Sequence, residues 1–454
     1  MEELKSSIPT NSAIQVKVWN TFTTPINNVF KESTLNTPKS SNKVASVKPV
    51  ARKKRDQPRL RFPEFTRKWS TSTLSKFLEL PIQEKVEVTS IDQLLTLRLH
   101  LKGLALCKDI NLQLGATDYY KRTAGQLIYG KQNFLNKAIA IIPKEFDGKC
   151  SSKDVPSFNI KYGDPDFIYY CITRDSYIKS KEMYAKGTGS KRISEKSILT
   201  FEIIFPSLEE QQKIGNFFKD IEEKISSLNN AINVLVKLKS SLGQKVFPIN
   251  DNKKPELRFA GFSSDWKSTK LKEFCTWSKG SDLKKDKLNF EGKGDLALHY
   301  GDLFALKGYI TRESLLTYTE YDEGAYIPTN SLLFPDSDVT PLGLATASAI
   351  DTPNVRASGG VIIGAIKDAN VASSFIAEQL VCNKEKFYPF ITGTTVRHIN
   401  PKGLEAIKVL IPSLEEQLKV SSLFKELEAL ERKLIKQKTN YEVFKQALLQ
   451  RMFV

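Results

Sequence analysis

The side chains of this chain that could do chemistry are cations, amides and aromatic rings gathered in short runs. Lysine and arginine contact phosphates, and arginine, glutamine and asparagine also hydrogen-bond base edges in the major groove. These residue types predict a DNA-contacting set, although each member could instead be a solvated surface residue. The candidates are Lys121, Arg122, Lys131, Gln132, Asn133, Lys186, Lys191 and Arg192 in the first half, and Lys279, Lys284, Lys285, Tyr300, Lys307, Arg312, Arg397 and His398 in the second.

The charge of the whole chain indicates the same kind of partner. Its 454 residues include 68 Lys and Arg against 51 Asp and Glu, a formal net charge of +17. Such an excess favours a polyanion. Nucleic acid fits better than a membrane, because the sequence has no long apolar run and no basic amphipathic anchor. Solubility alone is the other explanation of the charge.

Residues for catalysis or metal binding form no recognisable pattern. The sequence has no N-P-P-[FYW] motif, no glycine-rich loop between a strand and a helix, and no G-x-x-x-x-G-K-[ST] loop. We therefore expect no catalytic residues and no S-adenosylmethionine, ATP or metal bound by this chain. Five cysteines without a C-x-x-C pair are typical of reduced thiols in a cytoplasmic protein. The histidines, which lack metal-ligand spacing, are His100, His299 and His398.

Two long helices are predicted to position the candidate residues. The sequence P-S-L-E-E-Q occurs at Pro206 and again at Pro412. In each copy a serine precedes a glutamate by three residues, the spacing of a capping box in which both side chains bond free backbone N–H groups. The two predicted capping boxes are Ser207 with Glu210 and Ser413 with Glu416.

Apolar residues behind each cap recur at alternating steps of three and four, which predicts a coiled-coil seam. Lys239 interrupts the first seam and Gln437 the second. About 40 residues at about 1.5 Å per residue give a rod of about 60 Å, and its nearest candidate partner is the other copy. The seam residues, which could also serve in docking a partner, are Ile214, Phe218, Ile221, Ile225, Leu228, Ile232, Leu235, Leu423, Leu427, Leu430, Leu434, Tyr441, Phe444 and Leu448.

A second repeat shows that the chain is two units in tandem. The pattern L-R-F-x-x-F-x-x-x-W, called here the LRF motif, runs over Leu60–Trp69 and Leu257–Trp266. Trp69 and Trp266, at matched positions, are predicted core anchors. The predicted segments are a disordered extension (1–57), a first head (58–205), a first helix (206–247), a linker (248–254), a second head (255–411) and a second helix (412–454).

The two heads differ in sequence and are predicted to be mixed α/β domains. Helical segments are expected near 73–79 and 269–277, and strands at 138–142, 167–172, 199–205, 361–366 and 406–411. Between the heads only the Gly-Thr loops match well, at Gly187–Ser194 and Gly393–Asn400. Two such units pair their helices most simply about a pseudo-twofold axis. The predicted fold is therefore two α/β heads separated by two long antiparallel coiled-coil helices.

The repeated P-S-L-E-E-Q helix starts, the LRF motifs, the Gly-Thr loops and Tyr300-Gly301-Asp302 resemble the DNA specificity subunit of type I restriction-modification systems. The resemblance covers residues 58–454. The chain differs from the family in its long N-terminal extension and in the absence of a matching Tyr-Gly-Asp in the first head.

The resemblance implies two target recognition domains, each binding one half of a bipartite asymmetric DNA site. The helices would set the spacer and dock two methyltransferase subunits, and restriction/translocase subunits would join the full complex. The partner subunits would bind S-adenosylmethionine, ATP and Mg and would carry out methylation and cleavage.

Two other functions remain open at this point. One is a coiled-coil scaffold that binds DNA without sequence specificity, and the other is a self-contained nuclease or methyltransferase. A scaffold has no reason to keep matched helices and LRF motifs while both heads diverge, and the missing motifs disfavour an enzyme. The sequence therefore favours a reader of split DNA sites.

Overall fold

The structure is a computed structural model that describes residues 56–454 except 110–113, 115–116, 188–189 and 249–253. Nearly all of the predicted N-terminal extension, most of the linker and part of the first Gly-Thr loop lie outside these residues. None of the helices in the described part of the chain is long and apolar enough to cross a membrane.

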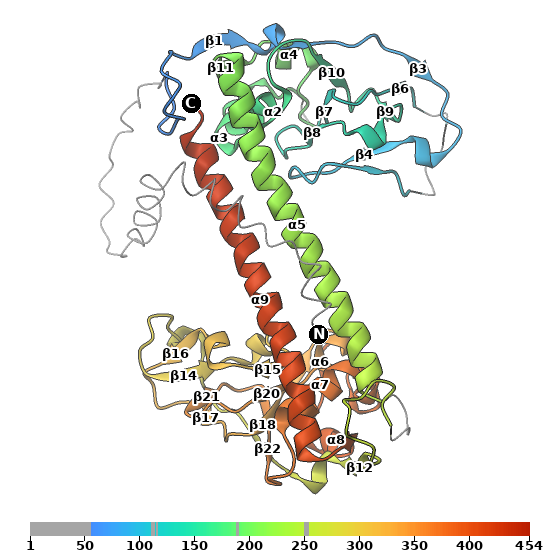
Figure 1. The fold of residues 1–454 in the computed structure, drawn as a ribbon, viewed down its shortest axis with the longest axis vertical. Coiled ribbons are helices and arrows are strands. Elements are labelled where there is room, and N and C mark those ends of the chain that lie inside the picture. The colour runs from blue at the N-terminus through green and yellow to red at the C-terminus, as the bar shows by residue number, and fades with distance from the viewer. Residues whose placement is uncertain (1–55, 110–113, 115–116, 188–189, 249–253) are drawn as a thin grey trace. The chain divides into compact units, whose positions relative to one another are not determined.

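The two predicted long helices are confirmed as α5 (Leu208–Val246) and α9 (Leu414–Arg451). They pack against each other along their length in antiparallel directions (Figure 1). Lys445 near the end of α9 pairs with Glu222 near the start of α5, and Lys239 of α5 pairs with Glu428 of α9.

The first head consists of small antiparallel sheets and short helices. A four-stranded sheet has the order β2 (Leu78–Glu79), β10 (Ser157–Ile160), β7 (Leu127–Tyr129) and β8 (Ile139–Ile141). A three-stranded sheet has the order β3 (Lys85–Val86), β6 (Tyr119–Lys121) and β9 (Cys150–Ser152), and β4 (Leu95–Leu97) pairs with β5 (Leu104–Leu106). The helices are α2 (Pro165–Thr173), α3 (Asp175–Ser180) and α4 (Glu195–Leu199).

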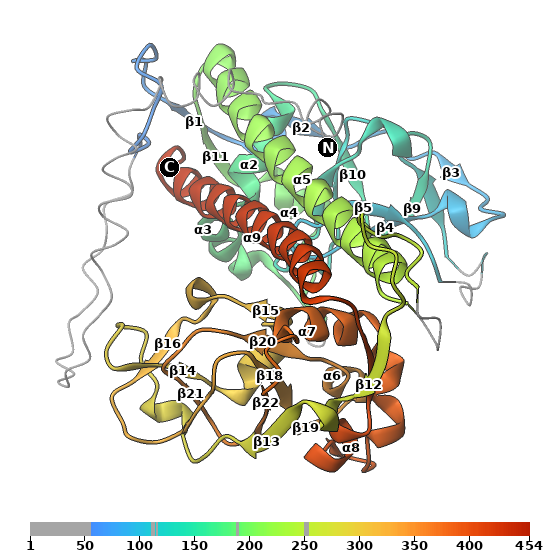
Figure 2. The same ribbon diagram turned by 60° about the horizontal axis from the view of Figure 1, so that its bottom comes forward.

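The second head has larger sheets. A five-stranded sheet has the order β13 (Cys275–Lys279), β22 (Val361–Ile366), β18 (Ser331–Pro335), β20 (Ser348–Ile350) and β15 (Gly308–Ile310). A four-stranded sheet has the order β16 (Thr317–Thr319), β14 (Asp295–Leu298), β21 (Val355–Ala357) and β17 (Ala325–Tyr326), and β19 (Ser337–Asp338) pairs with β23 (Arg397–His398). The helices are α6 (Pro341–Leu344), α7 (Ser373–Cys382) and α8 (Pro401–Glu405), and Figure 2 turns this head toward the viewer.

Each head is closed in the same way by its first and last strands. β1 (Ser70–Thr73), which follows the first LRF motif, pairs with β11 (Glu202–Phe205), which leads into α5. β12 (Lys267–Lys270) pairs with β24 (Lys408–Ile411), which leads into α9, in the corresponding register. The two ends of each head therefore meet at the start of a long helix.

Three local predictions are wrong. The expected strand at 167–172 is helix α2, because Asp164 caps it by accepting a hydrogen bond from the Phe167 backbone N–H at 2.8 Å and Pro165 occupies its first position. The helical segments expected near 73–79 and 269–277 are each only a single 3-10 turn between strands.

The described residues form 3-10 turns at Leu74–Lys76, Ile91–Gln93, Lys144–Phe146, Glu182–Tyr184, Leu271–Glu273, Lys285–Lys287, Tyr300–Phe304, Arg312–Ser314, Lys384–Lys386 and Tyr388–Phe390.

The third correction concerns the seam of α9. Leu430 is 42% exposed, and Phe424 is fully buried whereas Leu423 is only half-buried. The buried stripe runs through Val420, Phe424 and Glu428, so a pattern of apolar residues alone could not follow it. In α5 the predicted residues Ile214, Phe218, Ile221, Leu228 and Leu235 are buried. Among the remaining predicted seam residues of the two helices, Leu448 is buried. The half-buried ones are Ile225, Ile232, Leu427, Leu434, Tyr441 and Phe444.

Candidate DNA interface and the junctions that position it

An ion pair between a partly covered arginine and a buried glutamate joins the two repeated motifs at the start of each long helix. Arg61 of the first LRF motif contacts both carboxylate oxygens of Glu210 at 2.7 Å, and Arg258 contacts those of Glu416 at 2.7 and 2.8 Å. Both glutamates are 1% exposed. Bidentate arginine–carboxylate pairs are strong and fix geometry, so each pair locks its LRF motif onto its helix.

This use of the glutamates corrects the predicted capping boxes. Ser207 makes no side-chain cap bond, and Ser413 accepts only a long hydrogen bond of 3.4 Å from the Glu416 backbone N–H. Since each glutamate carboxylate binds an arginine, it does not return to the backbone of its own cap. The glutamates still lie in the first turn, where negative charge favours the helix dipole.

The glutamine that follows each glutamate fixes the helix start to the head behind it. Gln211 and Gln417 are fully buried. The amide nitrogen of Gln211 donates to the Pro206 carbonyl at 3.0 Å, and its oxygen accepts from the Asp164 backbone N–H at 3.1 Å. Gln417 repeats both contacts, with the Pro412 carbonyl and the Ala372 backbone N–H. Each glutamine therefore links its helix to the residue just before α2 or α7.

Aromatic clusters join each head to both long helices. In the first head Phe167 of α2 contacts Trp69, with ring centroids 5.9 Å apart. Phe453, which follows α9, completes this cluster at 5.4 Å from Phe167 and 5.8 Å from Phe218 of α5. Trp69 and Trp266 are buried, in agreement with their predicted role as core anchors. The equivalent cluster of the second head consists of Trp266, Phe375, Phe424 and Phe247.

Backbone hydrogen bonds complete the junctions. The Leu60 N–H donates to the Arg451 carbonyl at the end of α9, and the Leu257 N–H donates to the Lys245 carbonyl at the end of α5, both at 2.9 Å. Carbonyls in the last turn of a helix need such partners from outside the helix. Each LRF motif thus contacts the start of one helix and the end of the other.

The prediction that Arg122 contacts DNA is wrong. This arginine is 1% exposed inside the first head, where it donates to the Ser151 hydroxyl at 2.7 Å and to the Ser152 carbonyl at 3.3 Å. Burial lowers the pKa of Arg122 to about 10, so it stays charged at neutral pH. Lys131 is also largely covered and pairs with Glu195 at 2.7 Å. Both residues hold the head together.

The other candidates of the first head are on its surface. Lys121, Gln132, Lys186, Lys191 and Arg192 are exposed, and Asn133 is half-buried. Lys186 and Arg192 exchange backbone hydrogen bonds across the first Gly-Thr loop, which places their side chains close together in the fold. Arg192 pairs with Asp154 at 3.0 Å, and both side chains are about half exposed.

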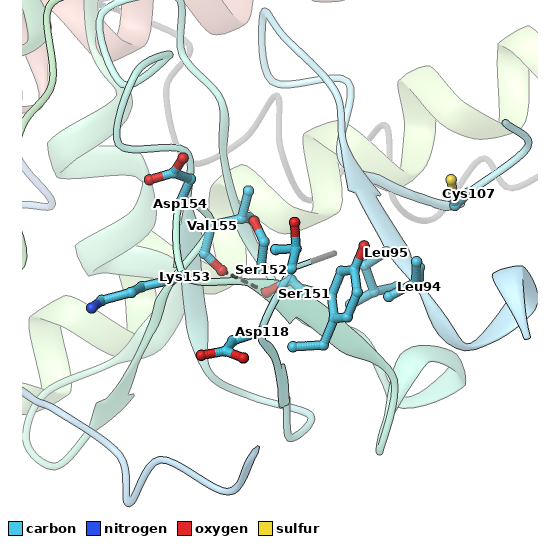
Figure 3. A pocket seen from close by; sticks show the side chains of 11 residues that line it. Leu94, Leu95, Cys107, Asp118, Ser151, Ser152, Lys153, Asp154 and Val155 are labelled. Carbon is cyan, nitrogen blue, oxygen red and sulfur yellow. Dashed lines mark hydrogen bonds between the residues drawn. The ribbon is translucent and has the colours of Figure 1, made fainter. Parts of the chain in front are cut away.

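A hollow of about 710 Å³ in the first head is lined in part by Asp154, the partner of Arg192 (Figure 3). Asp118 and Asp154 lie on the same side of it, with Lys153 between them. Their ion pairs, Asp118 with Lys85 and Asp154 with Arg192, are exposed and therefore weak. Carboxylates accept hydrogen bonds from the amino groups of cytosine and adenine, so this wall could read base edges. The sequence-based candidates did not include either aspartate.

The candidates of the second head divide in a similar way. Lys279, Lys284, Lys285, Lys307, Arg312 and His398 are exposed, and Lys279 lies 3.5 Å from Asp336. The pairing of β19 with β23 brings Asp336 beside the second Gly-Thr loop, where the Ile399 N–H donates to the Asp336 carbonyl at 3.1 Å. Arg397 is partly covered. Tyr300 is half-buried against Phe304, and its backbone N–H donates to the Ser358 hydroxyl, so its contacts are structural.

One polar network in the second head had no signal in the sequence. Arg356 is 8% exposed, donates to Asp295 at 2.8 Å and to Asp322 at 2.7 Å, and lies 4.1 Å from the ring centre of Tyr326. Its partners come from two segments, around Asp295 and at 322–326, which only the folded sheet brings together with Arg356. Among the described residues no group of three His, Cys, Asp or Glu side chains could hold a metal ion.

The comparisons with known proteins agree with this architecture. The family model described as "Type I restriction modification DNA specificity domain" matches the chain twice, over residues 73–238 and 263–441. Because these matches cover more than half of the chain, the chain belongs to this family. Its role is that of the DNA sequence-specificity subunit, which is the non-catalytic member of a type I restriction-modification system.

Individual relatives are distant in sequence. The type I restriction enzyme MjaVIII specificity subunit of Methanocaldococcus jannaschii is 23% identical over 337 residues, which cover 68% of this chain and 70% of that one. The putative type I restriction enzyme MjaX specificity subunit of the same organism is 24% identical over 277 residues, which cover 58% of this chain and 61% of that one. In fold the chain is similar to the type I restriction-modification S subunit from M. genitalium, with a TM-score of 0.59, 16% identity, and coverage of 88% of this chain and 99% of that one.

The buried arginine–glutamate pair gives a first prediction. Glu210→Ala should lower the free energy of unfolding by about 3 kcal/mol, since it leaves Arg61 without its carboxylate at a buried junction. Urea unfolding of the full chain measures this change. The matched control is Glu256→Ala, which removes an exposed pair with Lys245 and should cost less than about 1 kcal/mol. Equal losses in the two variants would contradict the proposed importance of the junction.

The corrected position of Arg122 gives a second prediction. Arg122→Ala should destabilise the first head by about 3 kcal/mol, because Ser151 and the Ser152 carbonyl lose a buried charged donor. Lys121→Ala, one residue away on the surface, should change stability by less than about 0.5 kcal/mol. Thermal unfolding of the two variants checks the difference. An Arg122→Ala chain of unchanged stability would show that the arginine is not structural.

Proposed function

We propose that each head reads one half of a bipartite asymmetric DNA site, and that the helix pair α5 and α9 fixes the distance between the halves. The supporting observation is the contrast between junctions and heads. The same arginine, glutamate, glutamine and aromatic contacts recur at both junctions, whereas the sheets of the two heads differ in size and order. Identical junctions with different heads suit two different half-sites held at one separation.

The proposed DNA surface contains the exposed cations of both heads and the wall formed by Asp118 and Asp154. Cations contact phosphates and contribute affinity, whereas carboxylates and amides select bases. The half-exposed ion pairs at Arg192 and Lys279 can exchange their carboxylate for a phosphate at low energetic cost, because exposed pairs contribute little to stability.

The proposed complex contains two methyltransferase subunits, docked on the helices and junctions, and restriction/translocase subunits in its full form. S-adenosylmethionine, ATP and Mg would be bound by those partners, and this chain would bind none of them. It would act on DNA in the cytoplasm.

The test is to map methylated sites by long-read sequencing in a methylation-free host that expresses this chain with its methyltransferase subunit. A split motif with a fixed unread gap, absent when this chain is omitted, is the expected result. A contiguous motif, or methylation that does not require this chain, would contradict the proposal. The latter result would favour a scaffold that binds DNA without sequence specificity.

The helix pair yields a separate prediction about the spacer. Seven residues inserted after Leu228 in α5 and seven after Leu434 in α9 keep the seam in phase and lengthen the pair by about 10 Å. The gap in the methylated motif should grow by about three base pairs, since base pairs are about 3.4 Å apart. Both half-sites should stay the same.

The matched control inserts the seven residues in α5 alone. This change breaks the antiparallel register, including the ion pair between Lys239 and Glu428. We expect lost activity from this control and not a longer gap. An unchanged gap in the double insertion would refute the idea that the helices set the spacer.

A further inference from the structure

Helices α2 and α7 occupy equivalent places in the two heads, and their sixth residues differ in chemistry. Phe167 and Phe375 are the third residue of each helix and lie in the equivalent aromatic clusters. The sixth residue is Tyr170 in α2 and Glu378 in α7. Both are buried, at 3% and 2% exposure.

In the first head the tyrosine hydroxyl takes part in an ion pair between the long helices. Tyr170 lies beside Glu222 of α5, and Glu222 pairs with Lys445 of α9, whose ammonium lies 5.5 Å from the centre of the Tyr170 ring. Burial and then the Glu222 carboxylate raise the pKa of Tyr170 well above its ordinary value. The hydroxyl therefore stays protonated and can donate to the carboxylate, which links the head to both helices.

The same arrangement recurs in the second head with a carboxyl group in place of the hydroxyl. Glu428 of α9 pairs with Lys239 of α5 at 2.6 Å. Glu378 of α7 lies beside Glu428 and near the Tyr309 backbone N–H. The two carboxyl groups meet over Gly308, where an added Cβ would lie 2.3 Å from the Glu378 Oε1 and 2.7 Å from the Glu428 Oε1.

Two buried carboxyl groups at this distance cannot both be ionised without a large penalty, and sharing one proton relieves it. Among the described residues neither Glu378 Oε1 nor Glu428 Oε2 has a hydrogen-bond partner, although both atoms are buried. Lys239 contacts Glu428 and neutralises one negative charge of the pair, whereas Glu378 has no ion pair among the described residues. The proton therefore belongs on Glu378, as it does on Tyr170.

We propose that Glu378 is a neutral carboxylic acid that donates its O–H to Glu428, and that it positions the second head on the helix pair as the Tyr170 hydroxyl positions the first. Unlike the tyrosine, this group can be ionised within a moderate pH range. We therefore expect alkaline pH to weaken the junction of the second head.

The direction of the pH effect follows from the folded and unfolded states. Burial and then Glu428 raise the pKa of Glu378 above that of an ordinary glutamate. Between these two pKa values the folded chain holds a proton that the unfolded chain has lost, so stability falls as the pH rises and levels off above the folded pKa. The population of opened junctions should grow by up to about tenfold for each pH unit in this window.

Other charged groups around the carboxyl pair do not reverse this expectation. Burial lowers the pKa of Lys239, but Glu428 and Glu378 more than offset burial, so its pKa stays above the ordinary value and it remains charged. Burial lowers the pKa of Lys425, and a lowered lysine pKa makes stability rise with pH, which is the opposite sign. The remaining groups near the pair or near these lysines are Asp351, Cys382, Lys384, Glu431 and Arg432.

Hydrogen exchange of the full chain at pH 7 and pH 9, corrected for the intrinsic effect of pH on exchange, tests the proposal. The amides of α7 should lose protection at pH 9 by about tenfold, whereas those of α2 should keep theirs. The comparison needs no DNA and no partner subunit, so it is independent of the proposed function. Equal behaviour of α7 and α2 in the unmodified chain would overturn the proposal, even if no variant folds.

Two variants test whether Glu378 is the group that titrates. Glu378→Gln keeps the size and a donor but cannot ionise, so α7 should be protected equally at pH 7 and pH 9. Tyr170→Phe removes a donor at the other junction and should weaken α2 at both pH values without creating a pH dependence. A Glu378→Gln chain that still loses α7 protection at pH 9 would place the titrating group elsewhere and refute the role of Glu378.

Discussion

A buried ion pair between an arginine near the start of each head and a glutamate at the start of each long helix is the contact on which the architecture depends. Each head is a sequence of about 150 residues whose two ends must return to one point. Pairing of the first strand with the last brings the ends together, and the bidentate contact of Arg61 with Glu210, or of Arg258 with Glu416, fixes them to the helix. The rest of the head is then free to differ, because within the head interior the junction uses mainly the start of α2 or α7, through Phe167 or Phe375.

Contacts at the helix ends join each unit to the long helix of the other unit. Phe453 at the end of α9 belongs to the aromatic cluster of the first head, and Phe247 at the end of α5 belongs to that of the second. The hydrogen bonds from Leu60 to Arg451 and from Leu257 to Lys245 follow the same pattern. Since every head is attached to both helices, bending or sliding of one helix would strain two junctions. This mutual attachment is what makes a helix pair suitable for holding a fixed distance.

The long helices, the tandem units and the buried tryptophans could be predicted because they depend on local periodicity and on repeated residues. The errors have a common physical cause, which is a polar side chain whose partner is distant in sequence. Glu210 has the spacing of a capping residue but binds Arg61, 149 residues away. Lys239 interrupts an apolar pattern, yet it pairs with Glu428 inside the seam. Arg122 is surrounded by exposed residues in the sequence, but Ser151 and Ser157 draw it into the head.

The same distinction separates cations that maintain the fold from those available to DNA. A cation whose partners are buried cannot leave them without exposing an unpaired charge, so Arg61, Arg122 and Arg258 are committed to the protein. Arg192 and Lys279 face carboxylates that are accessible to water, and exchange of such a partner for a phosphate changes little in the folded chain. The amino-acid composition gives only the net charge of the whole chain, +17, and does not separate these two kinds of cation. Burial decides which of these charges are free to exchange partners, and it removes Arg61, Arg122 and Arg258 from that set.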